Sequence, residues 1–247
     1  MIHQFFKKIL EIIFPNRCLS CNKLIGAEGL FCNADWQKLQ FITEPKCKIC
    51  SYPFEFIIDK NNLLCSKCLE RRPFYDKSIT LFRYNEQIKK IIGDLKYRDA
   101  THIIKKFAKM LEGKILAEAA NVDFIVAVPL HKKRLRERKF NQAWLLAREI
   151  FKIYCGVGTA CRAPTAMLLR TKYTHSQVGL KKSVREKNLH NAFALNPKYR
   201  DLVKGRKILL IDDVMTTGTT LEQCAKILKK AGAQEIIILT IAKTILN

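Results

Sequence analysis

The chain has 247 residues, with 45 lysines and arginines against 22 aspartates and glutamates, which gives a formal charge of +23. This length suits one large domain, or one ordinary domain with a small one, and no apolar run approaches the roughly 20 residues that a membrane helix needs. We therefore expect a soluble protein without stable membrane insertion. The charge excess favours polyanionic partners such as nucleic acid, nucleotides and sugar phosphates; an AT-rich genome is the alternative source of the lysines.

The amino-terminal residues predict a short amphipathic helix, because Ile2, Phe5, Phe6, Ile9 and Ile13 fall at helical spacing on one face. Charged side chains interrupt this apolar stretch and no small-residue cleavage site follows, so we do not expect a secretory signal. Two roles for the helix stay open: docking on the protein's own body, and contact with a membrane or partner. We expect a cytoplasmic, reducing environment, where cysteines ligate metal more often than they form disulfides.

Seven of the ten cysteines lie between Cys18 and Cys68. In the later group, Cys47-x2-Cys50 is followed after fourteen residues by Cys65-x2-Cys68. Each CxxC turn presents two thiolates to one side, and two such turns complete the tetrahedron that a structural Zn²⁺ prefers. The spacing therefore predicts a zinc site formed by these four residues. Four cysteines that only pack in a small core are the alternative.

The earlier cysteine group is less complete. Cys18-x2-Cys21 is followed after ten residues by Cys32, and Asp35 stands where a fourth cysteine is expected. A carboxylate can ligate zinc, so two interpretations stay open: a site with three cysteines and one aspartate, and a site that has lost its metal. A small module buries little apolar surface, so zinc would supply folding energy here and not chemistry.

The composition changes near Pro73. We therefore predict an amino-terminal helix and zinc-binding module at residues 1–75 and an α/β domain at residues 76–247, with no internal repeat or low-complexity linker between them. Short buried strands are predicted at 123–130, 207–213 and 235–242. Helices are predicted at 85–95, 101–119, 141–154 and 220–231. This alternation predicts a parallel sheet with helices on both faces, whose functional site lies at the carboxyl ends of its strands.

The segment KILLIDDVMTTGTT, from Lys207 to Thr220, joins a buried strand to a helix through two acids and a loop rich in threonine. Neighbouring strand residues point to opposite faces, so one of Asp212 and Asp213 can accept hydrogen bonds from sugar hydroxyls while the other reaches a Mg²⁺ shell. The loop offers free amides at a helix start, hydroxyl donors and a glycine that permits close approach of an anion. We call it the threonine loop: Thr216, Thr217, Gly218, Thr219 and Thr220.

A diol site and a phosphate site this close together indicate a ribose 5-phosphate. The stretch contains neither a Walker P-loop nor the glycine fingerprint of dinucleotide-binding folds. Chance threonines in an ordinary strand, turn and helix are the alternative.

The stretch from Lys207 resembles the phosphoribosyl pyrophosphate (PRPP) motif of type I phosphoribosyltransferases: four aliphatic residues, two acids, two more residues and a T-T-G-x-T-like loop. The run VPLHKKRLRERKFNQA at 128–143, the RT…Q..L…R..N pattern from Arg170 to Asn188 and the CxxC pairs resemble the ComF/GntX family, which is associated with DNA uptake in natural competence. The resemblance covers nearly the whole chain. Members usually show four CxxC pairs, and Asp35 interrupts the second one here.

This resemblance implies a type I phosphoribosyltransferase-like sheet with flanking helices, preceded by the zinc module. It implies that Asp212 and Asp213 hold the ribose hydroxyls and magnesium, and that the threonine loop holds the 5-phosphate. The loop after Pro129 corresponds to the pyrophosphate loop, and the segment from Arg170 to Gln177 to a mobile loop that covers the substrate. The further substrate-binding residues so implied are Pro129, Arg134, Arg170, Thr171 and Gln177.

The loop after Pro129 carries a basic run that suits a pyrophosphate. Solvated charge on a helix is the alternative for most of its members, which are Lys132, Lys133, Arg134, Arg136, Arg138 and Lys139.

Two functional hypotheses follow. In the first, the protein is a Mg²⁺-dependent enzyme that transfers ribosyl phosphate from PRPP to an unidentified acceptor; no residue stands out as a general base, and Thr216 stands where purine-type enzymes usually carry an acid. In the second, the protein binds and handles single-stranded DNA during uptake, with a helicase-like partner. Aromatic stacking platforms are expected for the second hypothesis. The candidates are Phe140, Trp144, Tyr173 and Trp36, with core packing as the alternative for Phe140 and Trp144.

Overall fold

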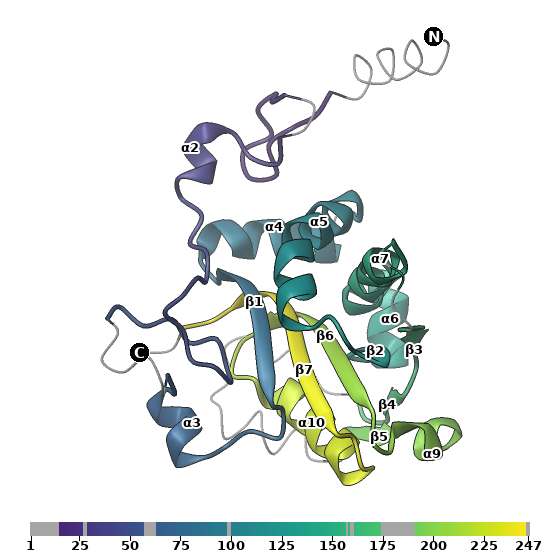
Figure 1. Ribbon diagram of the computed structural model, residues 1–247. Coiled ribbons are helices and arrows are strands. Elements are labelled where there is room, and N and C mark those ends of the chain that lie inside the picture. Colours follow the sequence, from purple (N-terminus) through teal and green to yellow (C-terminus); the bar gives the residue numbers. More distant parts are fainter. Residues whose placement is uncertain are drawn as a thin grey trace.

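The structure is a computed structural model that describes residues 15–26, 29–56, 63–97, 100–156, 158, 161–173 and 191–245. Its centre is a five-stranded sheet in the order β1-β7-β6-β2-β3, in which all neighbouring strands are parallel (Figure 1). The strands are β1 (Lys77–Arg83), β2 (Phe124–Ala127), β3 (Arg162–Thr165), β6 (Lys207–Met215) and β7 (Glu235–Lys243). The predicted parallel α/β sheet is confirmed.

Strands β2, β6 and β7 lie where the sequence predicts the three strands, but their first or last residues differ from the prediction. The predicted extension of β2 to Leu130 is wrong: the amide of Val128 still donates to Ile211 (2.9 Å), and Pro129 then has no amide to offer a neighbouring strand. Strand β6 runs beyond its predicted end at Asp213, because β7 continues beside it and pairs Lys243 with Met215.

Strand β1 was not predicted, because its sequence KSITLFR mixes hydroxyl residues with apolar ones. Residues of this strand are nevertheless buried on both faces, and the hydroxyls find partners there. The Thr80 and Thr240 hydroxyl oxygens lie 2.9 Å apart, and the Ser78 hydroxyl lies 3.1 Å from that of Ser51. Tertiary hydrogen bonds thus replace the apolar contacts that mark a buried strand in sequence.

Helices cover both faces of the sheet, as predicted. Helices α4, α5 and α7 pack on one face, where Ile88, Phe107 and Leu146 share a core, and α10 packs on the other, where Leu221 and Leu228 do so (Figure 1). None of the helices in the described ranges is long and apolar enough to cross a membrane. The helix bounds are α4 (Glu86–Tyr97), α5 (His102–Glu118), α6 (Lys132–Arg138), α7 (Gln142–Gly156) and α10 (Thr219–Lys230).

A small subsheet extends the core on the α10 side. It pairs β4 (Leu168–Arg170) with β5 (Phe193–Leu195) in antiparallel fashion, and η1 (Pro197–Tyr199) and α9 (Arg200–Val203) follow it. Leu168 and Phe193 belong to the same core as α10, so this subsheet holds the end of β4 against the rest of the fold.

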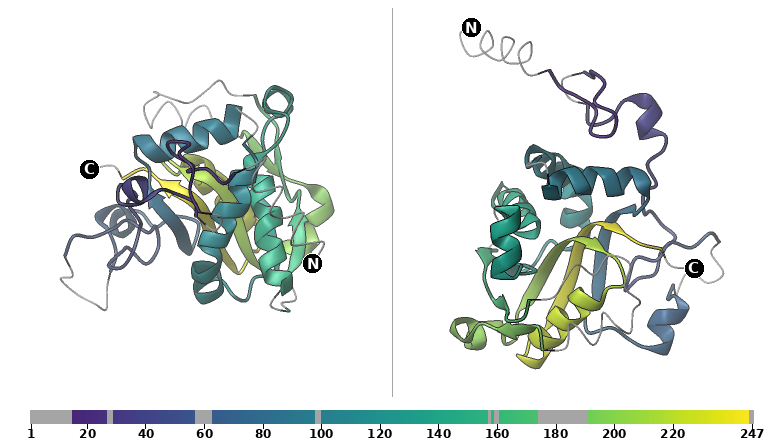
Figure 2. Two further views of the ribbon diagram at one scale, coloured as in Figure 1. Left: turned by 90° about the horizontal axis from the view of Figure 1, so that it is seen from above. Right: turned by 180° about the vertical axis from the view of Figure 1, so that it is seen from behind.

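The two cysteine groups lie on opposite faces of the sheet. Cys18 and Phe31 belong to the core of α4 and α5, whereas Cys47 and Cys68 belong to the core of α10. The chain between the groups runs past the outer edge of β1, where the amide of Ile42 donates to Leu81 (2.9 Å). The view from behind in Figure 2 shows the same path. The short helices α2 (Asn33–Trp36) and α3 (Ser66–Glu70) belong to the first and second group.

Ion pairs and hydrogen bonds connect the cysteine region to the sheet. Lys46 lies 3.0 Å from one carboxylate oxygen of Glu118 on α5, and Lys77 lies 3.2 Å from the other. The buried Lys243 at the end of β7 donates to the carbonyl of Cys50. The boundary at residue 75 stays a prediction, and the predicted amino-terminal helix lies outside the described residues.

Candidate functional site

Asp212 and Asp213 lie near the carboxyl end of β6, at the edge of the sheet where the sequence places the site. The backbone amide of Asp213 donates to the Asp212 carboxylate (2.9 Å). The two side chains leave the strand on opposite faces. The pair therefore presents acceptor oxygens in two directions at one strand end.

Asp213 has a cationic partner that the sequence did not predict. The ammonium nitrogen of Lys96, at the end of α4, lies 2.7 Å from Asp213 Oδ2. Burial alone would lower the pKa of Lys96, but the charge of Asp213 and the hydrogen bond to it raise this pKa above its usual value. Lys96 is therefore charged and neutralises one of the two acids.

Asp212 has the opposite electrostatic environment. Burial, followed by the neighbouring charge of Asp213, raises the pKa of its carboxyl to about 8. A carboxyl in this state gains most from an added cation, because a cation offsets both causes of the shift. The donor set, two carboxylates of which one lacks a full counter-charge, therefore fits a Mg²⁺ ion, which prefers oxygen ligands.

The threonine loop lies between β6 and α10, and the helix begins at Thr219 instead of the predicted Thr220. The hydroxyl oxygens of Thr217 and Thr219 lie 2.9 Å apart. The first amides of a helix have no partner within the helix, and the helix dipole adds positive potential there. These donors are of the kind that binds an anion, and the phosphate site at the loop stays a prediction.

Gly218 has a backbone that favours glycine. Its φ is +79°, in the left-handed region. A Cβ at this position would meet only the side chain of Met215, at 3.9 Å. In the free protein, the left-handed backbone conformation is therefore the reason for a glycine at this position. A bound anion, which needs space close to the backbone, would be a second reason.

The loop after β2 is fixed to the strand end by Asn141. Its side-chain amide donates to the carbonyl of Val128 (3.0 Å) while its oxygen accepts from the amide of Ala143 (3.0 Å) at the start of α7. Pro129 is half-buried between these points. The predicted basic run lies on α6, which has no buried residue, except that Lys139 follows the helix as its C-cap residue. Both predicted interpretations of this run, an anion loop and a solvated helix, fit this position.

Arg170 lies near enough to Asp212 to sense its charge, and Arg134 lies near Arg170. Burial lowers the pKa of Arg170, the charge of Arg134 lowers it further, and the charge of Asp212 opposes both. Thr171 is held at the end of β4, where its amide donates to Ala192 (2.9 Å) and its hydroxyl to Asn191 (3.1 Å). The predicted Gln177 lies outside the described residues.

Of the predicted aromatic platforms, Phe140 and Trp144 pack against the α4 and α5 core, so core packing is the correct alternative for them. Trp36 is half exposed, and its ring is tilted by 57° to that of Phe31, with 6.4 Å between the ring centroids. Tyr173 contacts the ring of His131 and receives the ammonium of Lys133 at 4.7 Å from its centroid.

The two cysteine groups repeat one backbone pattern. After each CxxC pair a residue adopts positive φ, Asn22 at 63° and Ser51 at 56°. The residue before each pair forms an antiparallel bridge to the third residue after it, namely Arg17 with Leu24 and Lys46 with Pro53. Sequence identity between the groups is too low to show this, but the common spacing of the cysteines is a signal for it.

The last two ligands of each group also occupy equivalent places. Cys32 and Cys65 are the N-caps of α2 and α3, and each accepts at its carbonyl from the amide three residues later, that of Asp35 (3.0 Å) and of Cys68 (2.9 Å). Asp35 thus stands where the second group has a cysteine. A shared helical turn sets the position of the fourth ligand in both.

Each group brings four potential ligand atoms within 4.8 Å of one another. In the first group Asp35 Oδ2 lies 3.2 Å from the sulfur of Cys18 and 3.3 Å from that of Cys32. Hydrogen bonds from Cys21 and Cys18 lower the pKa of Asp35 to about 2, so the carboxylate is ionised. All four cysteines of the second group are buried. Both sets fit structural zinc, the first with an aspartate as fourth ligand.

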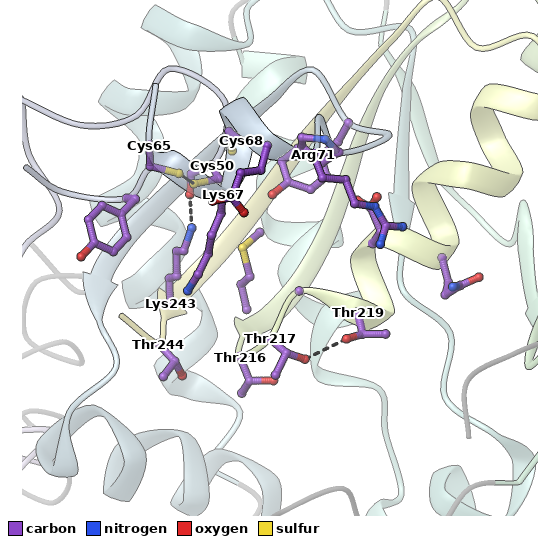
Figure 3. A pocket seen from close by; sticks show the side chains of 18 residues that line it. Cys50, Cys65, Lys67, Cys68, Arg71, Thr216, Thr217, Thr219, Lys243 and Thr244 are labelled. Atoms are coloured by element: carbon purple, nitrogen blue, oxygen red, sulfur yellow. Dashed lines mark hydrogen bonds between the residues drawn. The ribbon is translucent and has the colours of Figure 1, made fainter. Parts of the chain in front are cut away.

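A cavity of about 950 Å³ opens between the threonine loop and the second cysteine group (Figure 3). Its walls come from the threonine loop and the start of α10 on one side, and from α3 and the residues after it on the other. In Figure 3 the side chains of Lys67 and Arg71 lie above those of Thr216, Thr217 and Thr219. No sequence signal points to this cavity, because its two walls lie about 150 residues apart in the chain.

Comparison with protein families agrees with this architecture. A model described as "Double zinc ribbon domain" matches residues 9–69, and a model described as "Phosphoribosyl transferase domain" matches residues 143–245. The first covers both cysteine groups, and the second covers β3, β6 and β7 with the acids and the threonine loop.

Three relatives match most of the chain. Competence protein F of Haemophilus influenzae is 29% identical over 93% of this chain and 98% of its own length. DNA utilization protein YhgH of Escherichia coli (strain K12) is 28% identical over 81% and 84%, and Competence protein ComFC of Bacillus subtilis is 27% identical over 85% and 82%. Among solved structures, phosphoribosylpyrophosphate synthetase from Mycobacterium smegmatis matches 57% of this chain and 34% of its own, with 21% identity and a TM-score of 0.33.

Proposed function

The chain belongs to the ComF family, with a double zinc ribbon before a phosphoribosyltransferase-like domain, and from this premise we propose that it binds PRPP with magnesium and acts in natural competence. The relatives named for competence and DNA utilization support the biological role. The ligand assignment rests on the site described above.

The observation that carries the proposal is the order of groups along one strand end. Asp212 and Asp213 occupy the end of β6, and the threonine loop leads from there directly into α10. Carboxylates accept from the hydroxyls of a sugar, and the loop amides and hydroxyls donate to a phosphate. A ribose 5-phosphate has these two functions on one small molecule.

The surrounding cations suit the pyrophosphate of PRPP. Arg170 lies close enough to Asp212 and to Arg134 for both charges to shift its pKa. An arginine binds phosphate oxygens through two parallel hydrogen bonds. Bound Mg²⁺ would neutralise the acids and the pyrophosphate together and so favour departure of the pyrophosphate. Asp212, Asp213 and these two arginines are the residues that would position the ligand and its metal.

In the enzymatic form of this proposal, ribosyl phosphate passes to an acceptor, so the anomeric carbon loses its bond to pyrophosphate and gains one to the acceptor. In the alternative form, the pocket binds its ligand without turnover, and the protein handles single-stranded DNA with a helicase-like partner. The excess of basic residues suits both forms equally, because PRPP and single-stranded DNA are both anionic.

The test is calorimetry of PRPP with Mg²⁺ on the parent protein and on the Asp212→Asn/Asp213→Asn variant. Asparagine keeps the side-chain volume but removes the charge, so binding should disappear while the fold survives. Asp201→Asn on the exposed surface of α9 is the matched control and should bind as the parent does. A double variant with parental affinity would refute the assignment of the ligand.

Two further assays separate the enzymatic form from the alternative form: hydrolysis of PRPP by the protein, and uptake of DNA by the host. If the double variant loses PRPP binding and the host still takes up DNA, the pocket is real but does not serve competence. If both are lost, the ligand and DNA handling are linked.

A further inference from the structure

Gln142 is the first residue of α7 and stands at the base of the loop that follows β2. The preceding residue, Asn141, fixes this position, because its side-chain amide donates to the carbonyl of Val128 (3.0 Å). The backbone amide of Val128 in turn donates to Ile211 on β6 (2.9 Å), the residue before Asp212. The start of α7 therefore lies at the carboxyl edge of the sheet, beside the strand that carries the acid pair.

The side chain of Gln142 is buried, but its hydrogen bonding is incomplete. Only 2% of its surface is exposed, and its Nε2 atom has no hydrogen-bond partner among the residues that the structure describes. A buried donor without a partner costs free energy, because folding removes the water that it would otherwise bind. Such a donor gains from any acceptor that binds beside it.

The side chain of Gln142 extends toward the carboxyl edge of the sheet. Leu146, four residues later and therefore on the same side of α7, is fully buried in the core shared with α4 and α5. The Cα–Cβ bonds of a helix tilt toward its amino terminus, so the Gln142 amide lies beyond this core layer. Asp213, whose partner Lys96 belongs to α4, leaves β6 on the same face of the sheet.

The surroundings of this donor favour an anionic acceptor. The dipole of α7 adds positive potential at its amino terminus, and its first turn carries no acidic residue. Arg138, at the end of the basic helix α6, lies 5.5 Å from the ring centroid of Tyr97 at the end of α4. Lys96 directly precedes Tyr97, so cations from two helices meet at this edge of the sheet.

We propose that Gln142 is a ligand-binding residue whose Nε2 donates to an oxygen of the pyrophosphate group of PRPP. The inference rests on the proposed function and adds a donor to its site. An amide nitrogen cannot ligate magnesium, so Nε2 serves the anion and leaves the metal to the acids. The threonine loop keeps the 5-phosphate, and the two phosphate-bearing ends of the ligand therefore have separate donors.

A donor that is kept for a ligand should cost the free protein stability. Gln142→Met has nearly the same side-chain volume and removes the unsatisfied amide, so the unfolding temperature of the free protein should stay unchanged or rise. An amide that serves only the fold would have the opposite signature, because its removal lowers the unfolding temperature. Thermal unfolding without ligand measures this difference.

Calorimetry with two separate ligands, each in the presence of MgCl2, tests the binding role. Gln142→Met should bind inorganic pyrophosphate about tenfold or more weakly than the parent, because a hydrogen bond to a charged acceptor is lost. Its affinity for ribose 5-phosphate, which meets the acids and the threonine loop, should stay nearly unchanged. Gln234→Met makes the same change at an exposed residue just before β7, at the opposite edge of the sheet, and should bind both ligands as the parent does.

Gln142→Glu distinguishes a donor to the anion from a ligand of the metal. Glutamate keeps the shape of the side chain but replaces the amide nitrogen with an oxygen, so pyrophosphate binding should weaken at least as much as in Gln142→Met. Tighter binding of magnesium pyrophosphate by Gln142→Glu overturns the inference, because a carboxylate strengthens a metal site and weakens an anion site.

The remaining outcomes separate this inference from the proposed function. It is overturned if the parent does not bind pyrophosphate, if Gln142→Met keeps parental pyrophosphate affinity or loses both ligands equally, or if its unfolding temperature falls. If PRPP binds to the parent in any of these cases, the proposed function stands without this residue. If pyrophosphate binding depends on Gln142 but neither PRPP nor ribose 5-phosphate binds, the proposed function fails and the anion site stands.

Discussion

Lys96 places its ammonium nitrogen 2.7 Å from Asp213 Oδ2, so the protein carries its own cation at the acid pair. The lysine comes from the end of α4, more than a hundred residues earlier in the chain. The free site is thereby partly neutralised, and an incoming Mg²⁺ meets one acid already paired and another, Asp212, whose pKa is raised to about 8.

Replacement of Lys96 should make the protein depend on magnesium for stability. Lys96→Met leaves two neighbouring acids without this counter-charge, so the free protein should lose about 1 to 3 kcal/mol of stability. Added MgCl2 should then raise the melting temperature of the variant more than that of the parent. Lys89→Met, which breaks only an exposed pair with Glu86 on the same helix, is the control. Equal responses of variant and parent to magnesium would contradict the prediction.

Substitution of Gly218 should affect stability and binding separately. Gly218→Ala forces a Cβ into the left-handed region, which costs about 1 to 2 kcal/mol, although the cavity wall leaves room for the added carbon. Gly218→Val should add a larger loss of PRPP affinity, because its branched side chain lies where a phosphate approaches the loop. Thermal unfolding and calorimetry of both variants measure the two effects. Unchanged PRPP binding by Gly218→Val would remove the loop from the phosphate site.

Thr217→Val and Thr220→Val test the hydroxyl donors of the same loop. Each removes one hydroxyl at nearly constant volume and should weaken PRPP binding by about 1 to 3 kcal/mol, because a charged acceptor loses a partner. The unfolding free energy should change less. Calorimetry decides: if both variants keep parental affinity, the loop binds through its backbone amides alone.

Zinc should leave the two ribbons in a fixed order. Cys21 is exposed and Cys32 is half-buried, whereas all four ligands of the second ribbon are buried. A chelator should therefore remove one metal early and the other late. Asp35→Ala should lower the zinc content to one per chain, and Asp35→Cys, which completes a set of four thiolates, should slow the early release. Metal analysis during a chelation time course measures this, and simultaneous loss of both metals would contradict it.

The contact between Lys46 and Glu118 predicts a pH effect. Burial would raise the pKa of Glu118, but the hydrogen bond and charge of Lys46 outweigh burial and lower it. The ionised carboxylate therefore contributes stability that is present above the unfolded pKa of about 4.3 and is lost as pH falls through the folded pKa. Glu118→Gln should cost about 1 to 3 kcal/mol at pH 7.

The difference between parent and Glu118→Gln should shrink below about pH 4, since both proteins then carry a neutral side chain at this position. Denaturant titrations across pH measure it. Glu86→Gln, at an exposed pair, is the control. A difference that stays constant down to acid pH would show that the charge of Glu118 does not hold the ribbon to α5.

The parts of the site that the sequence predicts are local in the chain. The acids, the threonine loop and the helix after them follow one another without interruption, so strand and helix periodicity is enough to place them. The cysteine pairs are equally local, and their spacing carries the metal geometry. Arg170 and Arg134 were placed by resemblance; Arg170 senses the charge of Asp212 and Arg134 that of Arg170, and their role stays a prediction.

The rest depends on contacts between distant segments. Lys96 ends an ordinary amphipathic helix, and nothing in its neighbours indicates that α4 points toward β6. Lys67 and Arg71 read as surface residues of the zinc module until the module is placed against α10. Strand β1 was missed for a related reason, because Ser78 and Thr80 are satisfied by partners from elsewhere in the chain.

The position of β1 determines the order in which the protein can assemble during synthesis. In the sheet β1 pairs with β7, the last strand of the chain, at the opposite end of the sheet order from β3. A ribosome releases the amino-terminal segments first, and each zinc ribbon has its ligands close together in sequence, so the ribbons can bind metal early. The second ribbon cannot form its wall of the cavity before α10 and β7 have emerged, because the opposite wall and Lys243, which donates to the carbonyl of Cys50, come last in the chain. The second ribbon is therefore made early but reaches its final place only when the last strand has been made.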